Sequence, residues 1–481
     1  MYISYDKARS MLLSGEITVP ELTRIFLDRI KAFNDEYGAF ITVCEEYALA
    51  QAQNAQNMLD SGNAPLLCGI PVAIKDNICT KDIKTTCGSK MLEDFVSPYS
   101  ATAVKRLEAQ GAVIIGKTAL DEFAMGSTGQ NCYFCKTKNP YDPQYIPGGS
   151  SSGSAVAVAL NMCIIALGSD TGGSVRQPAA FCSVTGIKPT YRRVSRYGLV
   201  AFSSSLDQIG VIAENSHVAS IALDAICGFD KNDLTTKNIN DSILSDFEST
   251  EDKPYRLAVV NELFDCAEDD IKSHILSAVD FYKGKGYSVE FINMPSLEYG
   301  AECYYLISSA QAASNLSRFD GVRYGFRADA EDYEVAVIKS RNQGFGKEVK
   351  RRIMLGNYAL SSGFYDEYYK KALAVKQRIS EEYSDAFKSY DVILSPAFPS
   401  RVTQISQINQ NPAQIYKEDM CTVSANLAGL PSLATPCGYD HSGMPVGMML
   451  TADKFKEATL LKIASLFENE FERKLPDVIK E

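Results

Sequence analysis

The sequence predicts an α/β protein. Short apolar runs typical of buried strands alternate with helical stretches along the whole chain. The 481 residues, 46% of them hydrophobic, can bury a large core in one domain or in several smaller ones. Residues able to carry chemistry are spread from Lys75 to Asp419, and a division into modules would split them. We therefore expect a single domain over residues 1–481.

The first element is an amphipathic helix expected at residues 18–34. Thr18 and Glu21 have the spacing of a capping box, and apolar side chains follow at helical intervals, so this helix is interpreted as scaffold. Between residues 230 and 254 the chain is rich in Asp, Asn, Ser, Thr and Lys, which predicts an exposed connection. Strands are expected at residues 69–74, 113–115, 163–167, 257–260, 392–394 and 446–450.

Two Gly/Ser-rich segments, residues 148–154 and 168–174, predict one wall of an active site. Glycine lets backbone N–H groups turn inward, and serine is the residue type shared by both segments that can attack a carbonyl carbon. The alternatives for residues 171–173 are a simple turn or a phosphate cradle. The cradle is disfavoured because no Gly-Lys-Ser/Thr ending follows either segment.

A serine nucleophile needs a base, and the chain has only three histidines. His217, His274 and His441 lie outside the Gly-rich and strand-end segments, so they are interpreted as ordinary surface or packed residues. Lys75 ends the apolar run 69–74, where burial can lower a lysine pKa by about 3–5 units and leave it free to accept a proton. The alternative is that Lys75 pairs with Asp76 or caps backbone carbonyls.

Composition bounds the setting of the protein. Thirteen cysteines and an N-terminus without an apolar region predict a cytoplasmic protein without a membrane span. Cys132 and Cys135 form a C-x-x-C motif with no second pair at zinc-finger spacing, so no metal is expected in this chain. A net charge of −11 argues against this chain alone binding a nucleic acid.

Five segments, in this order, resemble the amidase signature family: residues 69–76, 148–151, 168–179, 186–190 and 195–198. The resemblance implies the amidase signature fold, a central mixed β-sheet flanked by helices on both faces, with a signature core at residues 69–210. It also implies a Ser-cisSer-Lys triad, in which Ser174 is the nucleophile, Ser150 bridges on a cis peptide and Lys75 is the base. The backbone N–H groups of Thr171, Gly172, Gly173 and Ser174 would hold the oxyanion.

Within this family the chain is most similar to the glutaminase subunits of tRNA-dependent amidotransferases, on residues 120–127, 205–210, 314–325 and 348–356. This narrower resemblance implies release of ammonia from glutamine through a Ser174 acyl-enzyme, to convert Glu-tRNA(Gln), Asp-tRNA(Asn) or both. It places tRNA, ATP and Mg²⁺ on a partner B subunit, includes a small C subunit to make a heterotrimer, and implies no cofactor in this chain.

The same resemblance assigns the glutamine pocket to Gly126, Tyr305, Arg352 and Asp419. A guanidinium matches the α-carboxylate of glutamine in a two-pronged way, and a carboxylate suits its α-ammonium. Arg351 is an alternative to Arg352, because the basic run 350–352 can be aligned either way.

Two positions depart from the family pattern, which has glycine at both. Ser152 is expected to tighten the loop after the serine pair, and Arg192 to affect a surface turn. Two other functions also stay open. One is a free-standing amidase that acts on small amides, and the other is a non-catalytic assembly subunit, against which the presence of Lys75, Ser150 and Ser174 argues.

Overall fold

The computed structural model describes residues 2–62, 64–239, 241–249, 254–408, 411, 416 and 418–480. Within this part of the chain the strands form an eleven-stranded sheet in the order β1-β3-β2-β4-β6-β5-β10-β11-β9-β7-β8. The strands are β1 (Phe40–Val43), β2 (Pro71–Lys75), β3 (Val113–Thr118), β4 (Ile165–Asp170), β5 (Thr185–Lys188), β6 (Gln208–Ala213), β7 (Arg256–Val260), β8 (Ser288–Ile292), β9 (Val392–Pro396), β10 (Ser432–Tyr439) and β11 (Pro445–Ala452).

Helices alternate with these strands along the chain. They are α1 (Tyr5–Ser14), α2 (Val19–Tyr37), α3 (Glu45–Asp60), α4 (Thr102–Ala109), α5 (Ser152–Ala159), α6 (Arg176–Phe181), α7 (Ser216–Ile226), α8 (Ile243–Glu248), α9 (Asn261–Asp265), α10 (Asp269–Gly284), α11 (Gly300–Asn315), α12 (Tyr333–Gly344), α13 (Lys347–Leu360), α14 (Lys370–Ala386), α16 (Met420–Leu427) and α17 (Glu457–Glu468). Across the described ranges, no helix is both long and apolar enough to cross a membrane.

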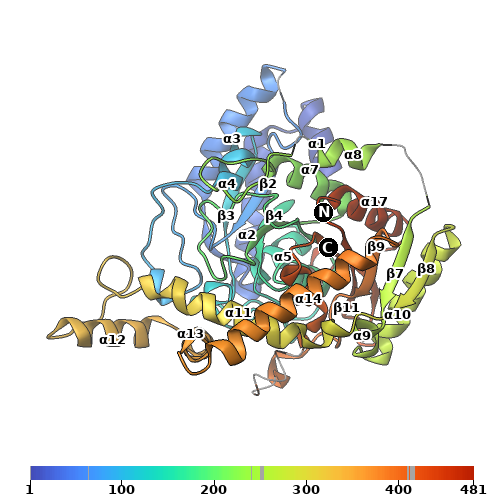
Figure 1. Ribbon diagram of the computed structural model, residues 1–481. Helices are drawn as coiled ribbons and strands as arrows, with labels where there is room; N and C mark the ends of the chain where they lie inside the picture. Colours follow the sequence, from blue (N-terminus) through green and yellow to red (C-terminus); the bar gives the residue numbers. More distant parts are fainter. Residues whose placement is uncertain are drawn as a thin grey trace.

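The sheet is mixed, which confirms the predicted fold class. Strand β2 runs parallel to β3 and β4, and β7 runs parallel to β8 and β9, whereas the strands between these groups pair antiparallel. In Figure 1, α7, α8 and α17 lie in the upper part of the molecule, α11, α13 and α14 lie across its lower part, and α12 projects from the body.

The strands that carry the predicted catalytic segments are buried on both faces. Every residue of β2 and β4 is buried, which is why both read as apolar runs in the sequence. Because β2 and β4 are parallel neighbours, with Ile74 opposite Leu167, their carboxyl ends meet at one edge of the sheet. This topology brings Lys75, the last residue of β2, close to Ser169 and Asp170.

The N-terminal scaffold helix forms as α2, three residues longer than the predicted range at its end. Thr18 and Glu21 make the predicted capping box, with the Glu21 side chain accepting from the Thr18 amide at 2.8 Å. Leu22, Phe26 and Ile30 form its buried face.

The connection at 230–254 is largely exposed among its described residues, as its composition predicts, but a few of its residues are buried. Asp230 is buried and accepts hydrogen bonds from the hydroxyls of Thr102 and Ser195, and the buried Ile243 opens helix α8, which packs on α7 and α17. Asp230 is an exception to the exposed composition because its carboxylate bonds to the signature core. Residues 240 and 250–253 lie outside the described part.

Candidate active site

Lys75 lies fully buried at the end of β2, where its ammonium reaches three oxygen atoms. Its Nζ lies 2.7 Å from Ser150 Oγ, 2.9 Å from Ser151 Oγ and 3.2 Å from the Ser169 carbonyl oxygen. Burial, which removes the water that stabilises the charged form, lowers its pKa to about 7, although Asp121 and other carboxylates oppose this effect. Near neutral pH the amine can therefore act as a base.

Lys75 does not form the ion pair with Asp76 that was the alternative to its role as a base. Asp76 instead makes a buried ion pair with Lys117 at 3.0 Å and accepts hydrogen bonds from the amide and hydroxyl of Thr86. Lys75 does contact a backbone carbonyl, that of Ser169, but its closest partner is the Ser150 hydroxyl.

The predicted serines come from the two Gly/Ser-rich segments. The Gly149–Ser150 peptide bond is cis, as the resemblance implies, and the Gly149 amide donates to Gln177 Oε1 at 2.9 Å. The Ser151 amide donates to the Ser174 carbonyl at 3.0 Å, which joins the two segments. Ser174 is 8% exposed and lines a small cavity, called here the inner pocket, together with Gly149 and Gly172.

The predicted oxyanion amides are only partly free to face this pocket. The Gly173 amide donates to Asp170 Oδ1 at 2.8 Å, so its assignment as an oxyanion donor is corrected: a buried carboxylate already takes this N–H. Gly172 and Ser174 line the inner pocket, and Thr171 is held by its hydroxyl, which donates to Asp207 at 2.7 Å. Gly173 keeps a conformational role, because its φ of 125° is one that side chains disfavour.

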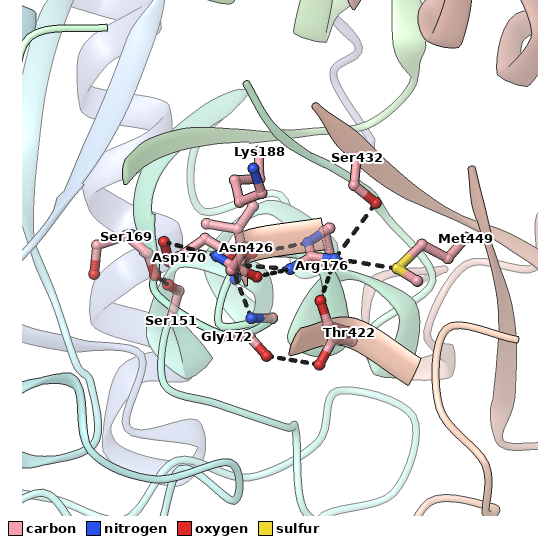
Figure 2. A network of polar contacts seen from close by, with 12 residues as sticks. Ser151, Ser169, Asp170, Gly172, Arg176, Lys188, Thr422, Asn426, Ser432 and Met449 are labelled. Atoms are coloured by element: carbon pink, nitrogen blue, oxygen red, sulfur yellow. Dashed lines mark hydrogen bonds and ion pairs between the residues drawn. The ribbon is translucent and has the colours of Figure 1, made fainter. Parts of the chain in front are cut away.

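A buried ion pair holds the nucleophile loop in place (Figure 2). The Arg176 guanidinium donates to both oxygens of Asp170 at 3.1 Å and to the Thr422 carbonyl at 3.0 Å. Burial would raise the pKa of Asp170, but the adjacent Arg176 holds that pKa well below its usual range. Asn426 also donates to Asp170 at 2.9 Å, so helix α16 is tied to the loop that carries Ser174.

The two arginines of the basic run on α13, Arg351 and Arg352, differ in burial and in the cavities that they line. Arg352 is 3% exposed and lines the inner pocket, where its Nε donates to Glu348 at 2.7 Å. Its Nη1 is buried and has no hydrogen-bond partner among the described residues. Arg351 is half-buried and pairs with the same Glu348. It does not line the inner pocket but a second, larger cavity that lies next to it. The geometry therefore favours Arg352 over Arg351 as the carboxylate ligand.

Asp419, at the start of α16, provides a negative charge at the same pocket. It accepts a hydrogen bond from the Tyr305 hydroxyl at 2.5 Å, and burial raises its pKa to about 6. The Arg352 guanidinium lies 4.4 Å from the centre of the Tyr305 ring. Tyr305, Arg352 and Asp419, which are far apart in the sequence, thus meet beside Ser174.

The inner pocket is nearly closed in this structure. Its volume of about 10 Å³ holds roughly one water molecule. A second cavity of about 280 Å³, called here the outer cavity, lies outside it and shares Gly126, Tyr305 and Arg352 with it. Tyr416 stacks on Tyr305 with ring centres 3.7 Å apart and lines the outer cavity. The inner pocket therefore leaves no room beside Ser174 for a ligand larger than a water molecule in this structure.

Gly126 belongs to both cavities and cannot carry a side chain there. Its φ is 149°, and an added Cβ would lie 2.6 Å from Asp121 and from the Asn131 side chain. Asp121 is buried, accepts from the amides of Gly129 and Asn131, and so organises the loop that follows Gly126.

The three histidines make contacts outside the candidate site. His217 stacks on Phe247, His274 lies 3.9 Å from Asp270, and the exposed His441 contacts Arg401. Among the described residues, no group of three or more His, Cys, Asp or Glu side chains could hold a metal ion.

The two departures from the family pattern have different outcomes. Ser152 does not need a positive φ, because it is the first residue of α5, and its hydroxyl donates to Thr137 at 3.2 Å. This bond ties the start of α5 to the segment of Thr137, and the expected tightening of the loop stays a prediction. Arg192 has a φ of 83°, a conformation that favours glycine, and lies in a turn after Tyr191.

Sequence reasoning missed several residues that support the site. Glu348, the partner of Arg352, is one of them. The two residues are four apart on α13, a spacing that could have revealed their pairing. Asp207, which holds Thr171, and Tyr416, which covers Tyr305, carry no local signal because their partners are distant in sequence.

The comparisons with known proteins cover almost the whole chain. The family model described as Amidase matches residues 21–461. The A subunit of the glutamyl-tRNA(Gln) amidotransferase of Ruminiclostridium cellulolyticum is 50% identical over 475 residues, which make up 98% of each chain.

Solved structures agree with this match. The crystal structure of the A subunit of the glutamyl-tRNA(Gln) amidotransferase from Thermotoga maritima is 38% identical, with a TM-score of 0.80 over 96% of this chain and 95% of that one. The native peptide amidase from Stenotrophomonas maltophilia is 26% identical, with a TM-score of 0.84 over 98% of both chains. By sequence, by fold and by its signature residues, the chain belongs to the amidase family.

Proposed function

We propose that this chain is the glutamine-hydrolysing subunit of a tRNA-dependent amidotransferase. The observation that carries the proposal is the position of Lys75, buried with a pKa near 7 and hydrogen-bonded to Ser150, close to a pocket that holds Ser174. The same pocket also contains Arg352 and Asp419, which suit the two charged ends of a free amino acid.

In the proposed reaction, neutral Lys75 accepts a proton through Ser150 as Ser174 Oγ attacks the side-chain amide carbon of glutamine. The amides of Thr171, Gly172 and Ser174 stabilise the oxyanion, and one such donor is typically worth about 10²–10³ in rate. The C–N bond then breaks, the proton returns to the leaving nitrogen, and ammonia departs. Water hydrolyses the acyl-Ser174 ester to glutamate by the same proton path.

Substrate selection rests on opposite charges at the two sides of the pocket. The buried Nη1 of Arg352 has no partner in the part of the chain that the structure describes, which suits a ligand carboxylate, while Glu348 holds the guanidinium in place. Asp419 faces the α-ammonium, with Tyr305 fixing its orientation. A small neutral amide would leave both charges unused.

The acceptor chemistry is proposed to occur on partner subunits. Relatives at 44–50% identity are named as the A subunit of glutamyl-tRNA(Gln) amidotransferase, which supports a multi-subunit enzyme that forms Gln-tRNA(Gln). Asp-tRNA(Asn) is proposed as a further or alternative acceptor. A B subunit would bind the tRNA and use ATP with Mg²⁺, a C subunit would complete the heterotrimer, and the whole would act in the cytoplasm. The net charge of −11 fits a division of labour in which another subunit holds the tRNA.

The test is glutamate release from glutamine by the purified chain, alone and with its B and C partners. We expect turnover that rises with partners, ATP and misacylated tRNA, and that is lost in Ser174→Ala. Ser277→Ala, which changes an exposed serine on α10, is the matched control and should behave as wild type. Trapping with hydroxylamine should yield γ-glutamyl hydroxamate only when Ser174 is present.

The free-standing amidase is the second candidate, favoured by the likeness to a peptide amidase. It predicts turnover of small neutral amides that does not respond to partners or to replacement of Arg352 and Asp419. Such a result, or silence under every condition, would overturn the proposed function.

A further inference from the structure

The C-x-x-C motif lies in the loop that forms one wall of the outer cavity. Residues 126–131 supply Gly126, Ser127, Thr128, Gln130 and Asn131 to that cavity, and Cys132 follows directly. The loop is held from inside by Asp121, which accepts from the Asn131 amide at 2.9 Å. Any change in the backbone at Cys132 therefore bears on a residue that faces the cavity.

The two thiols of this motif, called here the thiol pair, already lie in contact. Cys135 Sγ donates to Cys132 Sγ at a distance of 3.9 Å, and Cys132 is 2% exposed, whereas Cys135 is half-buried. Between them Tyr133 and Phe134 are 55% and 39% exposed, so the turn lies at the surface. The S–S bond of a disulfide is about 2.05 Å long, so the two sulfurs must move closer together for the bond to form.

The chemistry of the pair is that of a dithiol rather than of a metal site. The hydrogen bond from Cys135 lowers the pKa of the Cys132 thiol against the opposing effect of burial, and raises the pKa of Cys135. No group of three or more metal-ligating side chains occurs in the described ranges, so a third ligand is missing from around the pair. C-x-x-C without further ligands is the arrangement in which thiol–disulfide exchange is most common.

We propose that Cys132 and Cys135 form a reversible intrachain disulfide by exchange with a small-molecule disulfide, and that this modification reshapes the wall of the outer cavity. In the first step Cys132, as the thiolate that the hydrogen bond from Cys135 favours, attacks the small disulfide: one S–S bond breaks, a mixed disulfide forms, and one small thiol leaves. In the second step Cys135 attacks Cys132 Sγ and expels the second small thiol. The two cysteines lose two electrons and two protons, and the small disulfide gains them.

Closure of the disulfide pulls on contacts that order the cavity wall. Lys136, beside Cys135, donates to the Cys132 carbonyl at 3.1 Å, and Gln130 donates to the Thr137 carbonyl at 2.6 Å. These bonds tie both ends of the C-x-x-C turn to the residues that line the outer cavity. Oxidation should therefore change the entry of the substrate, measured as KM, more than the chemical step at Ser174, measured as kcat.

The first arm of the test measures the modification itself and is independent of activity. The purified chain is equilibrated with mixtures of oxidised and reduced glutathione, alkylated with N-ethylmaleimide and mapped by mass spectrometry. We expect a Cys132–Cys135 peptide two hydrogens lighter, reversed by dithiothreitol and absent in Cys135→Ser and in Cys132→Ala. Thiols that stay alkylated in every mixture, or a reaction that stops at the mixed disulfide, would overturn the proposal.

Cys266→Ser is the matched control, because Cys266 and Cys421 form another close pair, with sulfurs 4.0 Å apart. This variant should still form the Cys132–Cys135 disulfide, and a disulfide that maps to Cys266–Cys421 instead would refute the assignment.

The second arm rests on the proposed glutaminase function. Oxidation should raise the KM for glutamine several-fold in wild type and in Cys266→Ser, change kcat less than twofold, and leave Cys135→Ser unaffected. A disulfide that forms without any change in KM would refute its effect on the cavity. A chain with no glutaminase activity would refute the proposed function, while the mass measurement would still decide the modification site.

Discussion

Replacing Lys75 with methionine tests the central physical claim, that this amine is neutral in the folded protein near pH 7. Its pKa falls from 10.5 to about 7 on burial, which costs roughly 5 kcal/mol of folding free energy at pH 7. Three hydrogen bonds, to Ser150, Ser151 and Ser169, return roughly 3 kcal/mol. Methionine has a similar shape and no charge, so Lys75→Met should be about 2 kcal/mol more stable than wild type at pH 7.

The pH dependence of this difference gives the sharper test. Between pH 7 and 10.5 the unfolded lysine holds a proton that the folded lysine lacks, so wild-type stability rises with pH by about 1.4 kcal/mol per unit relative to the variant. For 481 residues this corresponds to roughly 1.4 °C in Tm per pH unit. Far-UV circular dichroism from pH 7 to 9.5 measures it, since the chain has no tryptophan.

Lys188→Met is the matched control. Lys188 is also buried with a pKa lowered to about 7, but it donates only to the backbone carbonyls of Pro189 and Leu430. It should show the same pH slope and keep glutamate release, whereas Lys75→Met should lose release. A Tm difference between Lys75→Met and wild type that stays constant over the range would show that folded Lys75 is charged, and would refute its role as the base.

Three further outcomes are expected for catalysis and one for stability. The kcat of glutamate release should rise about tenfold from pH 6 to pH 8, because a base with pKa near 7 goes from mostly protonated to mostly neutral, and a flat profile from stopped assays would contradict this. Below pH 6 the KM for glutamine should also rise, because Asp419, with a pKa of about 6, loses its charge. The Asp419→Asn variant should show this high KM at every pH. Arg352→Lys should raise the KM for glutamine about 10–100-fold, because lysine cannot bind a carboxylate in a two-pronged way, while Arg351→Lys should change this KM little. Equal effects of the two variants would refute the choice of Arg352 as the carboxylate ligand. Asp170→Asn should lower Tm by roughly 3–5 °C, the cost of an unpaired buried Arg176, and an unchanged Tm would show that the pair does not stabilise the loop.

The strands that bring the catalytic residues together were predictable because they are buried on both faces. The runs at 69–74 and 163–167 are apolar throughout, and they form β2 and β4. The order of the strands was not predictable, because β5 pairs with β10 across roughly 250 residues and nothing local encodes that pairing. The burial of Asp230 within the exposed connection at 230–254 was not predictable for a related reason: its partners lie elsewhere in the chain.

The candidate site divides in the same way. Lys75, Ser150 and Ser174 were found because each lies in a segment whose residue types have a local chemical reason. The turn of the Gly173 amide toward Asp170 was missed, since sequence does not give the direction of an N–H group. Tyr416 was missed because its stacking on Tyr305 depends on the packing of distant segments.

The attachment of the nucleophile loop to α16 has a consequence for synthesis of the protein. A growing chain that has emerged through β6 already contains Lys75, Ser150 and Ser174, but not Thr422 and Asn426, which anchor Arg176 and Asp170. The β10 strand that covers the outer side of β5 is also still missing. We therefore expect the proposed glutaminase activity to appear only once nearly the entire polypeptide has been translated, and a prematurely terminated product to carry the reactive groups without that activity.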